Sequence, residues 1–282
     1  MKYTQYSNAN DFLKRMTSIF EENELLNGLM FGVCLRLKDN LFLYGEKPLL
    51  AVVEENDVIH LAALMTPPHN LQLCAPETLS EDSMEVFAHG LRENGWIVPG
   101  IIAEKDLADS FAKMWKSILG CQYREGMKQL IHELRHVQTI DYSRGTLRQA
   151  YPEDLEKAVA WAKAFHLDCF GIVDPDRSSF IAEQTVSAGR LFFWEDSEAV
   201  SMAARIRPTP NGESIGFVYT PPEQRRHGYA TSLVASLSGQ ILDDGKQFCA
   251  LYTDVTNPTS NSIYRKIGYT PVCDVIEIHF EY

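Results

Sequence analysis

The sequence predicts an α/β protein with two domains in tandem. It has 282 residues, a composition typical of packed globular proteins (45% hydrophobic, 23% charged), and a series of strand and helix patterns that occurs twice. Single domains usually have roughly 100–200 residues, so this length suits two domains. Strands that alternate with helices indicate helices packed on a sheet. We expect domains over residues 1–138 and 145–282, with a linker near residues 136–145.

The second half shows its expected elements clearly. A helix should begin at Tyr151-Pro152-Glu153-Asp154, because proline and acidic residues suit a first helical turn. The third strand of this half should end before Pro221-Pro222, which cannot donate hydrogen bonds to a sheet. The expected series is strands at 191–194, 199–207 and 214–219, a helix from Gly228 to Gly245, a strand at 248–253, a helix at 258–267 and a strand at 275–280.

The first half repeats this order less distinctly. We expect helices at 11–20, 25–31, 83–91 and 107–119, and strands at 49–53, 58–65, 97–103 and 127–132. In this alignment of the halves, residues 66–70 take the place of residues 220–224. The following residues 71–75 contain neither glycine nor arginine.

The net charge of the chain and the spacing of its cysteines argue against several classes of function. The net charge is −12 and the pI about 5.1, which argues against a nucleic-acid partner, because phosphate backbones are bound by clustered Lys and Arg. The sequence lacks a signal-peptide pattern and an apolar run long enough for a membrane helix, so we expect a cytoplasmic protein without a membrane partner. The six cysteines include no C-x-x-C pair, and we expect no metal site.

The segment from Ile215 to Ala230 carries the clearest chemistry. A strand leads to a turn and then to a helix N-terminus, whose backbone N–H groups and partial positive charge favour an anion. Gly228 and Ala230 leave room for a pyrophosphate to approach the backbone. Arg225 and Arg226 can supply positive charge. The segment therefore predicts a pyrophosphate site over Arg225-Arg226-His227-Gly228-Tyr229-Ala230.

This loop resembles the R/Q-x-x-G-x-G/A motif of the general N-acetyltransferase (GNAT) superfamily, with Arg225, Gly228 and Ala230 at its defining positions. The downstream run Asn257 to Tyr269 is similar to the family's N-P-x-A/S helix. The resemblance implies two mixed-sheet GNAT domains in tandem, of which the C-terminal one carries the coenzyme loop. We interpret the N-terminal half as a degenerate GNAT-like domain.

The resemblance also implies roles for residues. Acetyl-CoA would be the acyl donor, and the backbone of Phe217, Val218 and Tyr219 would bind its pantetheine arm. Asn257 would contact the coenzyme, and Tyr264 would be the general acid that protonates the leaving thiolate. The acceptor would be a primary amine on a small molecule or a protein.

Several alternatives remain open from the sequence. Glu213, Asp254 and Glu183 are carboxylates that could serve as the general base. Asn257 could act only as a helix N-cap. A coenzyme-binding regulatory module without turnover is the alternative to an enzyme. The sequence identifies neither the acceptor, nor the acyl-chain length, nor the oligomeric state.

Overall fold

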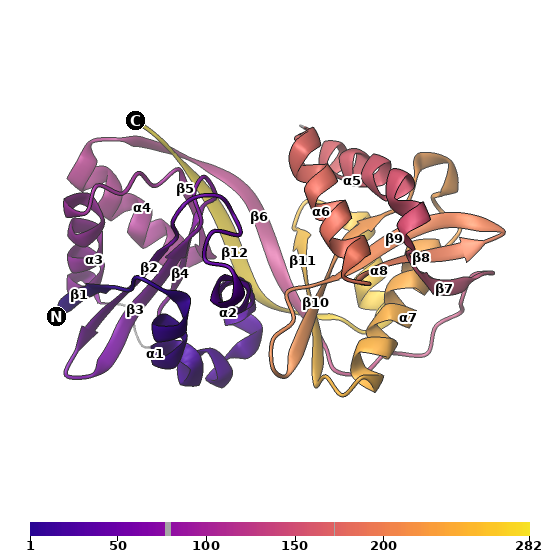
Figure 1. The fold of residues 1–282 in the computed structure, drawn as a ribbon, viewed down its shortest axis with the longest axis horizontal. Coiled ribbons are helices and arrows are strands. Elements are labelled where there is room, and N and C mark those ends of the chain that lie inside the picture. The colour runs from indigo at the N-terminus through magenta and orange to yellow at the C-terminus, as the bar shows by residue number, and fades with distance from the viewer. Residues whose placement is uncertain (77–79, 172) are drawn as a thin grey trace. The chain divides into compact units, whose positions relative to one another are not determined.

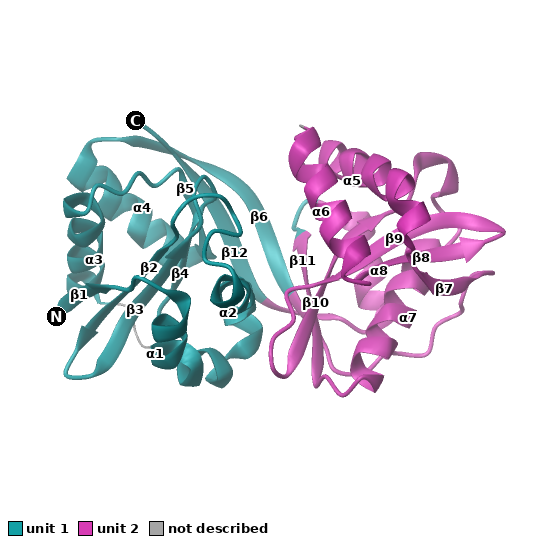
Figure 2. Ribbon diagram, in the orientation of Figure 1, with its two compact units in different colours: residues 1–131, 254–256, 273–282 teal, residues 132–253, 257–272 magenta. Residues whose placement is uncertain are grey.

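The computed structural model describes residues 1–76, 80–171 and 173–282, which divide into two compact units (Figure 2). Unit 1 comprises residues 1–131, 254–256 and 273–282, and unit 2 comprises residues 132–253 and 257–272. The last ten residues thus belong to unit 1, although they follow unit 2 in the chain. The division into domains over residues 1–138 and 145–282 stays a prediction.

Both halves of the chain contain the same order of elements, βααβββαβαβ (Figure 1). The first half has β1 (Lys2–Gln5), α1 (Ala9–Glu22), α2 (Glu24–Asp39), β2 (Leu49–Glu55), β3 (Val58–Met65), β4 (Leu71–Cys74), α3 (Glu81–Glu93), β5 (Gly100–Glu104), α4 (Lys105–Leu119) and β6 (Gln122–Leu134). The second half has β7 (Thr146–Gln149), α5 (Leu155–Phe170), α6 (Pro175–Ser187), β8 (Leu191–Asp196), β9 (Glu198–Ile206), β10 (Gly212–Tyr219), α7 (Tyr229–Asp243), β11 (Phe248–Asp254), α8 (Pro258–Ile267) and β12 (Thr270–Glu281). This repetition confirms the tandem α/β architecture.

Unit 1 is a mixed sheet with two helices on each face (Figure 1). Its strand order is β1-β2-β3-β4-β5-β12-β6, and β12 runs antiparallel to β5. Neighbouring residues of a strand point to opposite faces. Leu50 accordingly packs in the core under α1 and α2 with Phe20 and Phe31, whereas Leu49 packs with Trp115 under α3 and α4.

Unit 2 has the same layers around the strand order β11-β10-β9-β8-β7. Trp194 points into the core that contains α7 and α8, where Leu233 and Leu237 are fully buried. Its neighbour Phe193 points into the core that contains α5 and α6, where Ala162 and Ala182 are buried. The candidate loop joins the C-terminal end of β10 to the N-terminus of α7.

The expected elements of the second half agree with the structure, and α8 spans the predicted residues 258–267. In the first half, the strand expected at 97–103 begins only at Gly100, because Pro99 cannot donate to a ladder and Ile97 is 74% exposed. The helix expected at 25–31 continues as α2 to Asp39.

One expectation about the first half was wrong. We aligned residues 66–75 with the loop of the second half, but residues 71–74 form β4, which occupies the same place in the series as β10. The counterpart of the candidate loop is therefore the connection between β4 and α3, residues 75–80. Residues 77–79 of this connection lie outside the described part of the chain. Its sequence, Ala-Pro-Glu-Thr-Leu-Ser, also contains neither glycine nor arginine.

Candidate functional site

The parallel strands β10 and β11 separate along their length. Residues Gly212, Glu213 and Ser214 of β10 pair with Phe248, Cys249 and Ala250 of β11. Within the described residues, no further pair follows, although β10 continues to Tyr219 and β11 to Asp254. Backbone groups on this side of β10 are therefore available to a ligand after Ser214.

On its other side, β10 carries an irregularity. Its register with β9 shifts between Gly216 and Tyr219, and Phe217 has a φ of 54°. A positive φ is costly for a residue with a Cβ, and bulges of this kind change the direction of side chains and leave backbone groups unpaired. Phe217 packs against Phe165 of α5, with ring centroids 5.0 Å apart. The three residues expected to bind pantetheine, 217–219, thus lie at the irregular part of β10.

The loop after β10 ends in a helix N-terminus. A 3-10 turn at Pro222–Gln224 leads to Arg226 and Gly228, whose φ angles are 68° and 80°. Gly228 is the N-cap of α7 and has no side chain to satisfy the first N–H groups of the helix. The first turn of α7 contains no acidic residue. This arrangement offers N–H donors and a positive helix end to an anion.

The side chains of the loop have distinct environments. Arg225 Nη2 lies 2.5 Å from Asp168 Oδ2 at the end of α5, and Arg225 Nε donates to the Thr220 carbonyl at 2.9 Å. Arg226 and His227 are exposed, whereas Ala230 is half-buried. The Tyr229 hydroxyl donates to Asp196 at 2.9 Å. Arg225 therefore already has a carboxylate partner, and Arg226 is the more accessible cation.

Tyr264 lies in the core of unit 2 that also contains α7. It is 7% exposed and belongs to the same apolar cluster as Ile215 and Leu251, against which Val218 and Tyr229 also pack. Burial raises the pKa of the Tyr264 phenol, so the hydroxyl stays protonated at neutral pH. The structure thus brings the proposed acid together with residues of β10 and the loop.

Asn257 is the N-cap of α8. Its Oδ1 accepts a hydrogen bond from the Ser260 backbone N–H at 3.1 Å. An Asn in this position satisfies one of the unpaired N–H groups at the start of the helix. The capping interpretation therefore holds for its oxygen, while a coenzyme contact through its nitrogen stays a prediction.

The three candidate bases occupy different settings. Glu213 is 2% exposed, and its two carboxylate oxygens contact Arg190 and Arg205. Asp254 Oδ1 accepts hydrogen bonds from the backbone N–H and the hydroxyl of Thr256. Glu183 is exposed on α6. Glu213 is thus part of a buried ion-pair network, and none of the three has a setting that singles it out as a base.

Sequence reasoning missed His132, which we interpreted only as the end of a strand. It is 1% exposed at the end of β6, and its Nε2 lies 3.0 Å from the Thr253 hydroxyl on the separating part of β11. Its ring centroid is 6.5 Å from that of Tyr264. A histidine inside the apolar run Leu130-Ile131-His132 was the one signal that could have indicated it.

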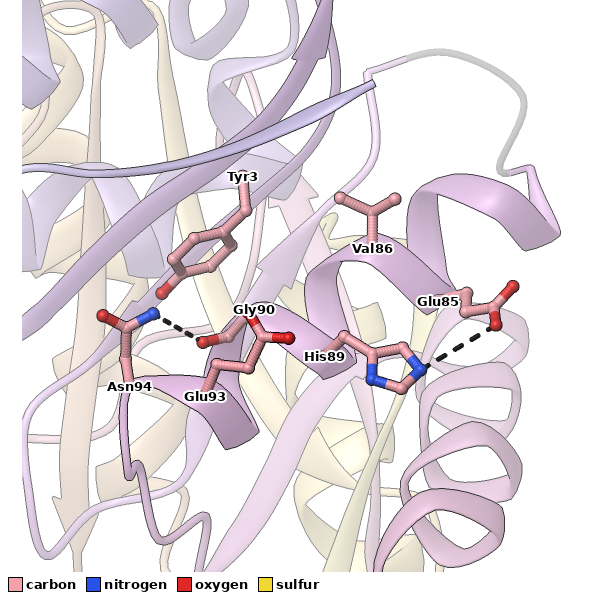
Figure 3. A pocket seen from close by; sticks show the side chains of 7 residues that line it. All are labelled: Tyr3, Glu85, Val86, His89, Gly90, Glu93 and Asn94. Carbon is pink, nitrogen blue, oxygen red and sulfur yellow. Dashed lines mark hydrogen bonds and ion pairs between the residues drawn. The ribbon is translucent and has the colours of Figure 1, made fainter.

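A separate hollow lies on the surface of unit 1. Figure 3 shows it beside α3, with Tyr3 facing Asn94 and Gly90, and with Glu85 3.8 Å from His89. None of the predicted site residues lines it.

In the described residues, no cluster of three or more His, Cys, Asp or Glu side chains could hold a metal ion. The same residues contain no helix that is both long and apolar enough to cross a membrane.

Comparisons with known proteins match part of the sequence and the whole fold. The model of the family described as FR47-like protein matches residues 193–275, which include β10, the loop, α7 and α8. No curated protein matches the sequence.

Solved structures resemble the chain over its full length. An acetyltransferase of the GNAT family from Colwellia psychrerythraea aligns over 100% of both chains, with a TM-score of 0.60 and 12% identity. A Drosophila protein aligns over 99% of this chain and 98% of its own, with a TM-score of 0.69 and 12% identity. A tandem GNAT protein from the clavulanic acid biosynthesis pathway aligns over 99% and 98%, with a TM-score of 0.55 and 11% identity. At such identities the likeness concerns the fold, and it confirms the tandem GNAT architecture.

Proposed function

We propose that this chain, which has the fold of the GNAT acetyltransferases in tandem, transfers an acetyl group from acetyl-CoA to a primary amine of a small molecule or a protein. The observation that carries the proposal is the course of β10. This strand leaves β11 after Ser214, bulges at Phe217 and leads to the glycine-capped N-terminus of α7. One continuous segment thus offers free backbone groups to the pantetheine arm and an anion site to the pyrophosphate.

In this proposal the coenzyme is held mostly by the backbone. The pyrophosphate binds at residues 225–230, where the helix end and Arg226 supply positive charge. The pantetheine arm pairs with the backbone of residues 217–219. The Nδ2 atom of Asn257 contacts the coenzyme while its Oδ1 continues to cap α8.

The chemical step needs a neutral amine, a stabilised oxyanion and a protonated leaving group. An alkyl ammonium has a pKa of about 10.4, so the acceptor must lose a proton before its nitrogen can attack. Unpaired N–H groups of β10 after Ser214 can stabilise the tetrahedral oxyanion. Burial keeps the phenol of Tyr264 protonated, and this phenol donates a proton to the leaving thiolate.

Acetyl-CoA binding and thiol release test the proposal. At 100 times its dissociation constant, acetyl-CoA should stabilise the protein by about 2.7 kcal/mol, measured as a rise in Tm. Free thiol should then appear when a panel of primary amines is added. Binding without thiol release on any amine would favour the regulatory acyl-CoA module, and no binding would contradict both functions.

A further inference from the structure

His132 is a buried polar side chain that the proposed reaction has not yet used. It lies on β6 between Ile131 and Leu134, both of which are also buried. The structure places its ring beside Thr253 of β11 and Tyr264 of α8. The imidazole thus lies at the separating part of β11, next to the proposed general acid.

Only one ring nitrogen of His132 has a hydrogen-bond partner in the structure. Nε2 is 3.0 Å from the Thr253 hydroxyl, whereas the buried Nδ1 has no partner within the described residues. Buried polar atoms in folded proteins are nearly always hydrogen-bonded, and a water or a functional role commonly explains the exceptions. When Nε2 carries the proton and donates to Thr253, Nδ1 holds a free lone pair.

The surroundings keep this imidazole neutral. Burial lowers the pKa of His132, and the positive charge of Arg265 on α8 lowers it further. The adjoining segments also carry ionisable groups. These are Tyr264 and Lys266 on α8, Tyr252 on β11, Glu133 and Arg135, which form an ion pair with each other, and Asp254, which accepts hydrogen bonds from Thr256. A neutral imidazole at neutral pH can accept a proton.

We propose that His132 is the general base of the acetyl transfer, taking a proton from the acceptor nitrogen through one water molecule bound at Nδ1. The inference rests on the proposed function and assigns the base that the sequence left open. Glu213 is less suited to this role, because both of its carboxylate oxygens are already in contact with arginines.

The proton transfers balance without a further reactant. The acceptor ammonium first gives one proton to solvent. The lone pair of the resulting neutral amine forms the C–N bond as the carbonyl π pair moves onto oxygen, and the positively charged nitrogen of the intermediate gives a second proton through the water to Nδ1 of His132. The C–S bond then breaks, and the thiolate takes the phenolic proton of Tyr264. The proton on His132 finally returns to the phenolate through the same water, which restores both side chains. The ring centroids of His132 and Tyr264 are 6.5 Å apart, so the two side chains are neighbours in the core.

The test compares His132→Gln with the wild-type protein. Glutamine can keep the hydrogen bond to Thr253, because its amide reaches the position of Nε2, but it has no nitrogen that titrates near neutral pH. We expect kcat to fall about 100-fold while the Kd of acetyl-CoA stays unchanged. The wild-type rate should fall at acidic pH as His132 is protonated, and the variant should lose this acidic limb. His279→Gln, a substitution in β12 of unit 1, is the matched control and should keep the wild-type rate.

Three outcomes would overturn the inference. A kcat of His132→Gln within about threefold of wild type, with the acidic limb retained, would exclude His132 as the base while leaving acetyl transfer intact. If His132→Gln does not fold, the kcat of His132→Asn and the pH profile of the wild-type rate test the inference instead. A wild-type profile without an acidic limb would also contradict the inference. A wild-type protein that binds acetyl-CoA but releases no thiol would instead contradict the proposed function, and the inference with it.

Discussion

Ser214 of β10 and Ala250 of β11 form the last paired position between these two parallel strands in the described structure. After this pair, β10 bulges at Phe217 and reaches the loop, while β11 continues to Thr253 beside His132. The separated part of these strands thus leads on one side to the proposed coenzyme loop and on the other side to the proposed proton-transfer residues. The predictions below test each side of it.

Gly228→Ala should weaken acetyl-CoA binding. A Cβ at this position meets only Ser143 Cβ at 3.8 Å, so the protein has space for the methyl group. The φ of Gly228 is +80°, however, and the methyl group would lie where the pyrophosphate approaches in the proposed complex. We expect a loss of stability of about 1–2 kcal/mol from the left-handed backbone. The Kd of acetyl-CoA, measured by calorimetry, should rise at least about tenfold.

Gly245→Ala provides the control for this backbone strain. Gly245 has a φ of +95° just after α7, and a Cβ there would meet nothing within 4 Å. Its stability loss should match that of Gly228→Ala, while its Kd for acetyl-CoA should equal the wild-type value. Equal affinities of the two variants would contradict the proposed position of the pyrophosphate.

Tyr264→Phe should slow turnover without loosening the fold. No hydrogen bond of its hydroxyl appears among the described residues, so removal of the oxygen costs the folded state little. We expect kcat to fall about 100-fold or more, with an unchanged Kd for acetyl-CoA. Tyr269→Phe, which loses a 2.8 Å hydrogen bond to Ser238, should behave oppositely, losing about 1 kcal/mol of stability and no activity. Wild-type turnover in Tyr264→Phe would remove this residue from the mechanism.

Asp168→Asn should strengthen coenzyme binding modestly. Asp168 holds Arg225 at 2.5 Å, and a carboxylate beside the loop repels a pyrophosphate. The two side chains are both exposed, so the effect should be small, about two- to fivefold in Kd, and should shrink with added salt. A weaker affinity in this variant would show instead that Asp168 holds Arg225 in the binding orientation.

Local sequence signals predicted much of the fold and of the loop. Proline at 221 and 222, glycine at 228 and the apolar stripe of α7 define a strand, turn and helix within one short segment, and the structure has them there. Four-residue β4 was missed because a run as short as Leu-Gln-Leu-Cys has too little periodicity to distinguish it from a loop. The pairs Arg225–Asp168 and His132–Thr253 join residues far apart in the chain, and no local pattern encodes them.

The position of β12 in the sheet of unit 1 also depends on contacts between residues far apart in the chain. It leads to a further prediction. Ile278 is fully buried opposite Ile101 of β5, so the last strand completes the core of unit 1. Ile278→Ala should cost about 2–5 kcal/mol of stability in chemical unfolding. Val272→Ala on the same strand, where the side chain is 48% exposed, should change stability by less than about 0.5 kcal/mol. Equal stabilities of the two variants would contradict the assignment of the last strand to the core of unit 1.

Titration calorimetry of the whole chain with acetyl-CoA tests the central claim most directly. The loop of unit 2 has glycine and arginine at the end of a strand that has left its neighbour, whereas the sequence of residues 75–80 has neither. We predict one acetyl-CoA bound per chain, with binding weakened by Gly228→Ala and unaffected by Gly245→Ala. Absence of binding, or a second equivalent site that remains in Gly228→Ala, would contradict the account.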